Sequence, residues 1–274
     1  MSYQLNTYIS TERELPTDEM IFSIVQMPTG FLFTVTTTRG YLIKAGEVRH
    51  EGASMSDLMA TLRGVVGECE ISTIGVASLE LVVSTPKFVL IPEHLYEAGN
   101  DRAYLESVCH LDAGMTVCSD YIESIKAWSV FVADNNMVSA SRIVLPGVRV
   151  RCQYSKLLGD YMLRESENSD TLAVHVRKGA ADYVVLRNSK PLLANTFVCD
   201  GFDDTLYFAL DMVNRMGLDA EKLKVMLSGE VTYTDFDTLR HYFGDVRLNN
   251  GKPLRILEPE FQHLHSYRYV LGLS

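Results

Sequence analysis

The chain has 274 residues, of which 47% are hydrophobic and 22% are charged, and its formal net charge is -10 at pH 7. This apolar content suffices for one large core or two of ordinary domain size. The acidic balance disfavours nucleic acid and anionic lipid surfaces as partners, because both carry negative charge. No stretch is apolar enough for a membrane-spanning helix, and the first twenty residues lack the basic start and apolar centre of a signal peptide. We therefore expect a globular, cytoplasmic protein without membrane insertion.

Apolar residues alternate in three runs near the N-terminus, with Pro, Gly and Arg-Gly turn signals between them. These predicted strands cover residues 21–27, 30–38 and 41–45. A helix is predicted next over 54–66, where Ser54 precedes Asp57 by three residues as in a capping box. Further strands are predicted over 71–76, 79–83 and 88–91. This segment therefore reads strand, strand, strand, helix, strand.

The middle of the chain predicts a helix near 102–111, strands over 115–121, 128–133 and 148–152, and a helix that begins near Tyr154. Trp128 and Phe131 are three residues apart and would face opposite sides of a strand, so they are interpreted as packing residues rather than a base-stacking platform. Pro146-Gly147 is the best candidate for a domain boundary.

The first pattern returns in the second half of the chain. Strands are predicted over 172–177, 182–186, 191–197 and 224–227, with an amphipathic helix over 203–216 before the last of them. Asp203 is the expected N-cap of that helix. The two copies start about 150 residues apart. We therefore predict an α/β fold of two related subdomains, 1–147 and 148–274, closed by a helix over 261–273 that packs on the second sheet.

This repeated element order resembles the actin-like ATPase superfamily, whose core is a duplicated ribonuclease H-like fold and whose members include sugar kinases, the Hsp70 ATPase domain, and the assembly proteins PilM and GspL. Four motifs resemble a bacterial family of that superfamily, domain of unknown function 3822, known chiefly from Bacteroidetes. The motifs are STPKFVLIPEHLYE from Ser84, NTFVCDGFDDTLYFAL from Asn195, VMLSGE from Val225 and FQHLHSY from Phe261. The resemblance implies a fold, and it assigns no activity.

In catalytic members of the superfamily, the first turn of each meander carries an Asp-x-Gly pattern. The aspartate holds the metal ion or its water, and the glycines let backbone N–H groups approach the phosphates. Laid against that pattern, His175 stands where the second-half aspartate belongs, and Arg177 and Lys178 stand on glycines. Gly179 and the later Asp182 do fit. A solvated hairpin turn is the simplest interpretation of the two basic residues, and a different anion as their ligand is the alternative.

The other expected nucleotide contacts are also degenerate. The first-half turn, residues 25–28, has no carboxylate, and Pro28 lacks a backbone N–H. The expected adenosine-binding strand ends in Gly229-Glu230 where two glycines are typical. A carboxylate at 4 Å from triphosphate oxygens would be unfavourable by on the order of 1 kcal/mol. The cleft candidates are therefore His175, Arg177, Gly179, Gly229 and Glu230, with no catalytic residue, cofactor or metal site predicted.

Other reactive residues have simpler explanations. Five cysteines are widely spaced without a CxxC pair, so reduced and mostly buried thiols are expected: Cys69, Cys109, Cys118, Cys152 and Cys199. Cys109 and His110 are adjacent, and adjacent helical residues do not share a proton readily. His263 and His265 are two apart, and such residues point away from each other on a helix.

Three functions remain open from the sequence. The first is a non-catalytic interaction or scaffold protein that binds one or more protein partners. The second is a divergent ATP-dependent kinase or ATPase that binds nucleotide through substitutes such as Arg177 and Gly229. The third is a small-molecule sensor that uses the cleft without turnover.

Overall fold

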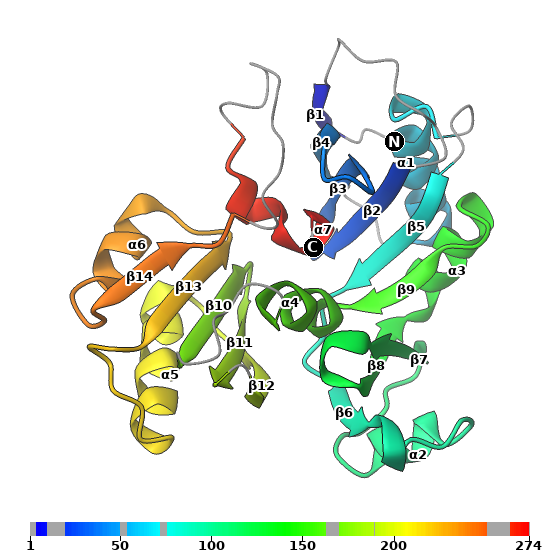
Figure 1. The fold of residues 1–274 in the computed structure, drawn as a ribbon. Helices are drawn as coiled ribbons and strands as arrows, with labels where there is room; N and C mark the ends of the chain where they lie inside the picture. The colour runs from blue at the N-terminus through cyan, green and yellow to red at the C-terminus, as the bar shows by residue number, and fades with distance from the viewer. Residues whose placement is uncertain are drawn as a thin grey trace.

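The computed structural model describes residues 4–9, 20–49, 54–71, 76–162, 170–188, 190–250 and 264–273. Across these residues the chain forms two mixed sheets, one for each half, and a smaller third sheet that belongs to the first half (Figure 1). No helix in the described ranges is long and apolar enough to cross a membrane.

The first sheet has six strands in the order β1-β4-β3-β2-β5-β9. They are β1 (Gln4–Ile9), β2 (Met20–Met27), β3 (Gly30–Thr37), β4 (Leu42–Arg49), β5 (Val76–Val83) and β9 (Arg149–Cys152). Strands β2, β3 and β4 form the predicted antiparallel meander, whereas β5 and β9 join in parallel. Strand β3 is buried along its whole length, which is typical of a strand in a sheet that is covered on both faces.

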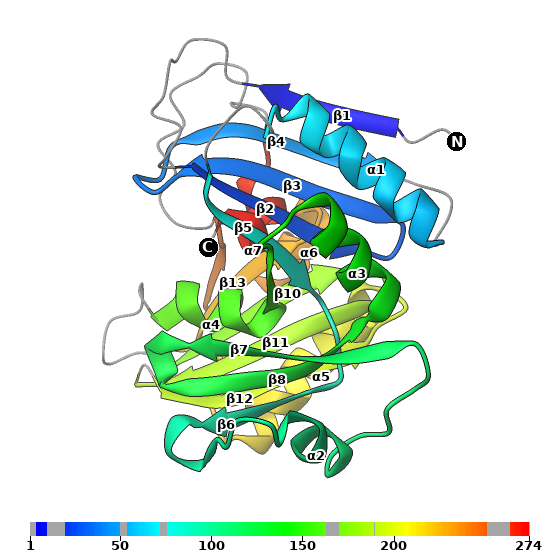
Figure 2. The same ribbon diagram turned by 90° about the vertical axis from the view of Figure 1, so that its right-hand side faces the viewer.

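Helices α1 (Met55–Glu68) and α3 (Asn135–Val144) lie together on one face of this sheet (Figure 2). The predicted cap of α1 is confirmed, because the Ser54 hydroxyl accepts a hydrogen bond from the Asp57 backbone N–H at 3.2 Å. Helix α3 was not predicted, although Asp134 caps it in the same manner at Met137 N, 2.8 Å away. Both helix starts thus follow from a local polar residue.

The strand predicted over 71–76 is wrong in its bounds. Ile71 lies in a turn, residues 72–75 lie outside the described ranges, and β5 runs from Val76 through the separately predicted run at 79–83. Leu81, Val82 and Val83 are buried, so the second half of β5 provides most of its packing. The apolar run that follows β5 in the sequence is correct and forms β6 (Phe88–Pro92).

The third sheet is inserted between β5 and β9 and has the order β6-β8-β7. Its other elements are β7 (Met115–Ile122), β8 (Ala127–Asp134), the 3₁₀ helices η2 (Glu93–Leu95) and η3 (Glu123–Ile125), and α2 (Asp101–Glu106). Helix α2 is shorter than predicted. The packing roles of β8 are confirmed, because the Trp128 ring stacks on Tyr96 at 4.3 Å while Phe131 is fully buried in the main core.

The second sheet has the order β12-β11-β10-β13-β14, the same as β4-β3-β2-β5-β9 in the first half. Its elements are β10 (Thr171–Arg177), β11 (Ala180–Arg187), β12 (Lys190–Val198), α5 (Phe202–Arg215), β13 (Lys224–Gly229), α6 (Tyr233–Leu239) and β14 (Asp245–Leu248). The predicted repeat is confirmed. Asp203 is not the cap of α5: Gly201 occupies that position without a side-chain hydrogen bond, and Asp203 lies in the first turn.

Helix α4 (Gln153–Met162) follows β9 and lies between the two halves, where it contacts β9 and β12 (Figure 1). Strand β9 pairs with β5 and belongs to the first sheet, so the two sheets are separated in the sequence after Cys152. The predicted boundary between folding units at residue 147 stays a prediction. The closing helix was predicted on the second sheet, and this is wrong. Helix α7 (Val270–Leu273) packs on β2, β3 and α4, where the Thr34 hydroxyl donates to the Gly272 carbonyl at 2.8 Å. The 3₁₀ helix η5 (Ser266–Tyr269) before it does contact β13, so the predicted packing on the second sheet is correct for this part of the segment.

Candidate functional site

A cavity of about 150 Å³ lies between the two halves. It is lined by Val25, Gln26, Met27, Pro28, Leu32, Ser84, His175, Val176, Arg177, Gly229, Glu230, Arg268 and Leu271. The fold therefore brings together the turn after β2, the end of β10 and the end of β13, which the sequence singled out. Four of the five cleft candidates line this cavity, which we call the cleft cavity. The fifth, Gly179, lies in the exposed β10–β11 turn.

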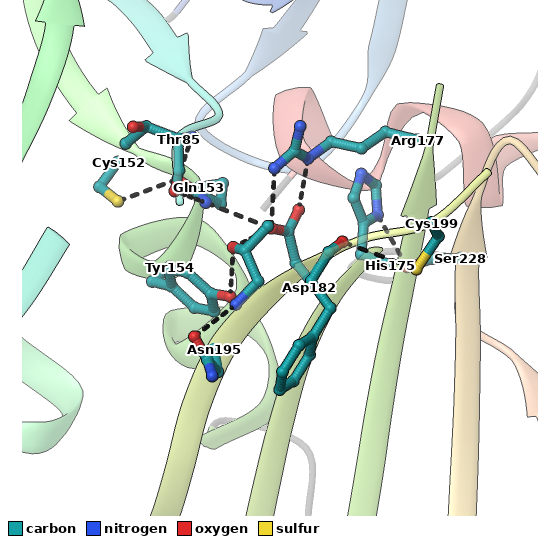
Figure 3. Close-up of polar contacts among 12 residues, drawn as sticks. Thr85, Cys152, Gln153, Tyr154, His175, Arg177, Asp182, Asn195, Cys199 and Ser228 are labelled. Atoms are coloured by element: carbon teal, nitrogen blue, oxygen red, sulfur yellow. Dashed lines mark hydrogen bonds and ion pairs between the residues drawn. The ribbon is translucent and has the colours of Figure 1, made fainter. Parts of the chain in front are cut away.

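The centre of the site is Asp182, which has no exposed surface. Arg177 reaches over it from the end of β10 (Figure 3). The guanidinium donates from Nε to Oδ2 at 2.9 Å and from Nη2 to Oδ1 at 3.2 Å. Burial opposes the charge of Arg177, but the adjacent carboxylate raises its pKa above the usual value. The two groups form a bidentate, nearly dry ion pair.

Two further donors complete the surroundings of Asp182. The Thr196 hydroxyl donates to Oδ1 at 2.6 Å, and the Gln153 side-chain amide donates to the same oxygen at 3.3 Å. Three of these four contacts end on Oδ1 and one ends on Oδ2. The Asp182 carboxylate is therefore engaged by protein donors, and its two contacts with Arg177 are charge-assisted.

Gln153, at the start of α4, also joins the two halves. Its amide donates to the Thr85 carbonyl at 2.7 Å, and its oxygen accepts from the Thr85 N–H at 3.3 Å. Thr85 follows β5 in the first half, whereas Asp182 lies in the second, so one buried side chain bonds both (Figure 3). Sequence reasoning missed this residue. Its signal was a polar residue directly after a predicted strand, between the apolar residues Cys152 and Tyr154.

His175 is buried and contacts Ser228, with 2.9 Å between Nδ1 and the hydroxyl oxygen. Its pKa is lowered to about 4, chiefly by burial, while the Asp182 carboxylate opposes the shift and the Arg177 guanidinium contributes to it. The imidazole is therefore neutral at pH 7. A general base works best with a pKa near the working pH, and Ser228 is fully buried, so this pair is poorly suited to nucleophilic catalysis.

The two candidate glycines have structural reasons to be glycine. Gly229 has a φ of +91°, and a Cβ placed there would lie 1.9 Å from the Val176 carbonyl oxygen. That same carbonyl accepts from the Glu230 N–H at 2.7 Å. Gly179 has a φ of +79° and open space around it, as a hairpin turn requires. Close strand packing and turn geometry explain both residues without a phosphate.

The remaining reactive residues give no further site within the described residues. No group of three His, Cys, Asp or Glu side chains there is placed to hold a metal ion. All five cysteines are free, and Cys69, Cys152 and Cys199 are buried. Burial raises the pKa of Cys69 and of Cys152 to about 12, so neither is a ready thiolate. His263 lies outside the described residues.

The two sheets of matching strand order, with a cavity between them, define an actin-like ATPase fold. The chain belongs to the family described as "protein of unknown function (DUF3822)", whose model matches residues 15–246. A comparison with curated proteins gave no match.

Solved structures agree on the fold. A Bacteroides thetaiotaomicron protein with an actin-like ATPase fold and unknown function has a TM-score of 0.71 and 19% identity, over 85% of this chain and 92% of that one. The PilM-PilN type IV pilus biogenesis complex matches with a TM-score of 0.55 and 11% identity, over 92% and 96%. The ethanolamine utilization protein EutJ from Carboxydothermus hydrogenoformans gives 0.51 and 9%, over 92% and 88%.

Proposed function

We propose that this chain is a non-catalytic, cytoplasmic actin-like protein that acts by binding a protein partner. The observation that carries the proposal is the bidentate contact of Arg177 with Asp182. A cation at this carboxylate would have to displace a guanidinium that is already desolvated and paired. Mg²⁺ is bound through carboxylates and several retained waters, whereas this carboxylate is buried and already accepts from four protein donors.

The first half supports the same proposal. The turn between β2 and β3 places Pro28 beside the cleft cavity, and proline has no N–H to donate to a phosphate. Glu230 lines the other side and would repel one. A cavity of about 150 Å³ is of the size that holds a benzene-sized molecule, whereas drug-sized ligands need about 300–1,000 Å³. The space between the halves is thus poorly matched to a nucleoside triphosphate.

A protein partner is the proposed ligand because the chain offers exposed apolar surface and a net charge that repels nucleic acid. Val198 at the end of β12 is 74% exposed, and Tyr207 on α5 is 62% exposed. Exposed large apolar residues are typical of interaction surfaces when they gather. PilM, which is similar in fold only, forms a complex with PilN in type IV pilus biogenesis. By analogy with that protein, we propose assembly rather than turnover as the role of the fold here.

The test is a thermal-shift titration of the full chain with Mg-ATP up to about 10 mM, beside the Arg177→Gly variant. We expect no rise in the Tm of the natural chain. A ligand of the folded state raises the free energy of unfolding by about 2.7 kcal/mol at one hundred times its Kd, and Tm rises with it. Such a rise in the natural chain, lost on adding EDTA, would refute the proposal and favour the divergent ATPase or kinase. A rise in Arg177→Gly alone would show that the arginine closes the site.

A further inference from the structure

Strand β12 is the outermost strand of the second sheet, and its outer edge has no partner strand among the described residues (Figure 1). The equivalent strand of the first sheet is β4, because β4-β3-β2-β5-β9 and β12-β11-β10-β13-β14 follow the same order. At β4 the outer edge is covered by β1, which pairs with it in antiparallel orientation. The position that a strand fills in the first half is therefore open in the second.

Most of the open edge of β12 lacks the features that protect an edge strand. Natural edges are protected by charged side chains, proline, bulges or short length. In β12 a lysine, a proline and a register shift lie within residues 190–193, whereas residues 194–198 contain no charge and no proline. The opposite edges of the two sheets, β9 and β14, have four residues each and carry charged side chains. Of these three edges, β12 is the one best suited to pair with a further strand.

The backbone of β12 offers hydrogen-bonding groups along its outer edge. The Cys199 N–H donates at 3.2 Å to the turn before β11, on the inner side of the strand. Backbone groups alternate between the two sides of an antiparallel strand, so those of Ala194, Thr196 and Val198 point away from β11. The Thr196 N–H donates to the Asn195 side-chain oxygen at 2.9 Å, a local contact that an incoming strand can replace.

The side chains of β12 are arranged symmetrically about Asn195. Two apolar residues, Leu192 and Val198, lie three positions before and after it and are 46% and 74% exposed. Two exposed residues of opposite charge, Lys190 and Asp200, lie five positions before and after it. In an antiparallel pair of identical strands centred on Asn195, each leucine lies near the valine of the other copy and each lysine near the aspartate. Apolar and oppositely charged cross-strand neighbours both stabilise a sheet.

We propose that β12 pairs with the β12 strand of a second copy of this chain, in antiparallel orientation about a two-fold axis at Asn195. The second sheets of the two copies then form one continuous sheet. Such a contact uses the same surface twice and closes at two copies. The inference rests on the proposed role of Val198 in a protein-binding surface. It does not involve the cleft cavity, so a negative result here would leave the Mg-ATP test as it stands.

The test is sedimentation equilibrium of the full chain over about 1 to 100 µM, in about 0.15 M salt to screen the repulsion between chains of net charge -10. We expect a reversible equilibrium between monomer and dimer, because a single pair of edge strands forms a small interface. A monomer at every concentration would overturn the proposal. A mass that grows beyond two copies would also overturn it, since the β12 contact closes at the dimer.

The variant Val198→Lys locates the contact. It places a charge against the partner's Leu192, and we expect the dimerisation constant to weaken about tenfold or more. Val198 is exposed at the end of its strand, so the substitution leaves the core intact. The matched control is Ile143→Lys, at a residue of α3 in the first half that is 54% exposed, and it should dimerise as the natural chain does. Equal dimerisation of Val198→Lys and the natural chain would place the contact elsewhere and refute the proposal.

Charge reversals test the register of the two strands. Lys190→Glu and Asp200→Lys each bring like charges together at both ends of the strand pair, and we expect each to weaken dimerisation about threefold to tenfold. The double variant Lys190→Glu/Asp200→Lys restores opposite charges and should dimerise about as well as the natural chain. Both side chains are exposed, so none of these variants should change the urea midpoint of the monomer. A double variant as weak as the single ones would rule out antiparallel pairing about Asn195.

Discussion

The two halves of the molecule share a strand order and a turn geometry, yet they carry different chemistry at the same place. Strand β2 meets β3 with Met27 opposite Gly30, and β10 meets β11 with Arg177 opposite Ala180. Both hairpins therefore turn over two residues. The first of these turns holds Pro28 and no charge, whereas the second is flanked by a buried ion pair. The repeated backbone geometry therefore forms without the side chains that would bind a nucleotide.

The buried charges of the two halves also lie in different places. In the second half, the buried charges are the ion pair of Arg177 and Asp182 at the cleft. In the first half, the buried pair of Glu80 and Lys156 lies instead at a separate cavity beside α7. The cleft is consequently charged on one side only. A symmetrical pair of phosphate turns would need carboxylates and bare backbone on both sides.

The largest expected effect is at Arg177. Arg177→Met leaves Asp182 buried with only Thr196 and Gln153 as donors, and we expect a loss of about 3–5 kcal/mol in the free energy of unfolding. Urea denaturation measures it. The double variant Arg177→Met/Asp182→Asn should recover most of this loss, because no buried charge is left. Equal stability of Arg177→Met and the natural chain would mean that the pair is not desolvated.

The same experiment on the first half sharpens the comparison. Lys156→Met leaves Glu80 with Arg151 at 4.0 Å and the Ser23 hydroxyl at 3.3 Å. We expect a loss of similar size, which Lys156→Met/Glu80→Gln should reduce. Neither variant should change the thermal-shift response to Mg-ATP, because Lys156 and Glu80 do not line the cleft cavity.

The next effect is a pH dependence that belongs to the second half. His175 has a pKa of about 4 in the folded chain and about 6.5 when unfolded. Between these values the unfolded chain binds a proton that the folded chain does not, so stability falls as pH falls from about 6.5 to 4. The loss should reach about 3 kcal/mol. His175→Asn should flatten the profile of urea midpoint against pH in this window, and an unchanged slope would contradict the role of His175.

The repeated fold was predictable because its signals are local. Alternating apolar runs, turn residues and the Ser54 cap each depend on neighbours in the sequence, and apart from the run at 71–76 they appear in the structure. Strand β1, strand β14 and helix α6 were not predicted. Helix α6 carried a usable signal, since Thr232 and Asp235 form a full capping box. Strand β1 has no such signal, as its place is set by pairing with β4.

The cleft was predictable only in part. The residues that stand in for the nucleotide motifs could be named from the strand order, and the structure places most of them around one cavity. Their partners could not be named. Arg177 and Asp182 are five residues apart on neighbouring strands, but Gln153 and Thr196 reach Asp182 from other elements. The position of α7 on the first sheet likewise depends on contacts between distant segments, such as Thr34 with Gly272.

The smallest expected effect is a difference in stability between two glycine variants, Gly229→Ala in a packed strand and Gly179→Ala in a turn. In Gly229→Ala, the new Cβ would lie 1.9 Å from the Val176 carbonyl oxygen at a φ of +91°, so β13 has to shift away from β10. We expect a loss of about 2–3 kcal/mol in the free energy of unfolding. Gly179→Ala has a similar φ of +79° with open space around it and should lose about 1 kcal/mol.

The first half offers the matched measurement for this pair. A Cβ at Gly30 would lie 2.0 Å from the Val48 carbonyl oxygen. Gly30→Ala should therefore lose about as much free energy of unfolding as Gly229→Ala, although Gly30 does not line the cleft cavity. Similar losses at Gly30 and Gly229, with a smaller one at Gly179, would show that Gly229 is retained for strand packing. If Gly229→Ala cost no more than Gly179→Ala, packing would not explain Gly229, and a ligand that needs bare backbone there would become the better explanation.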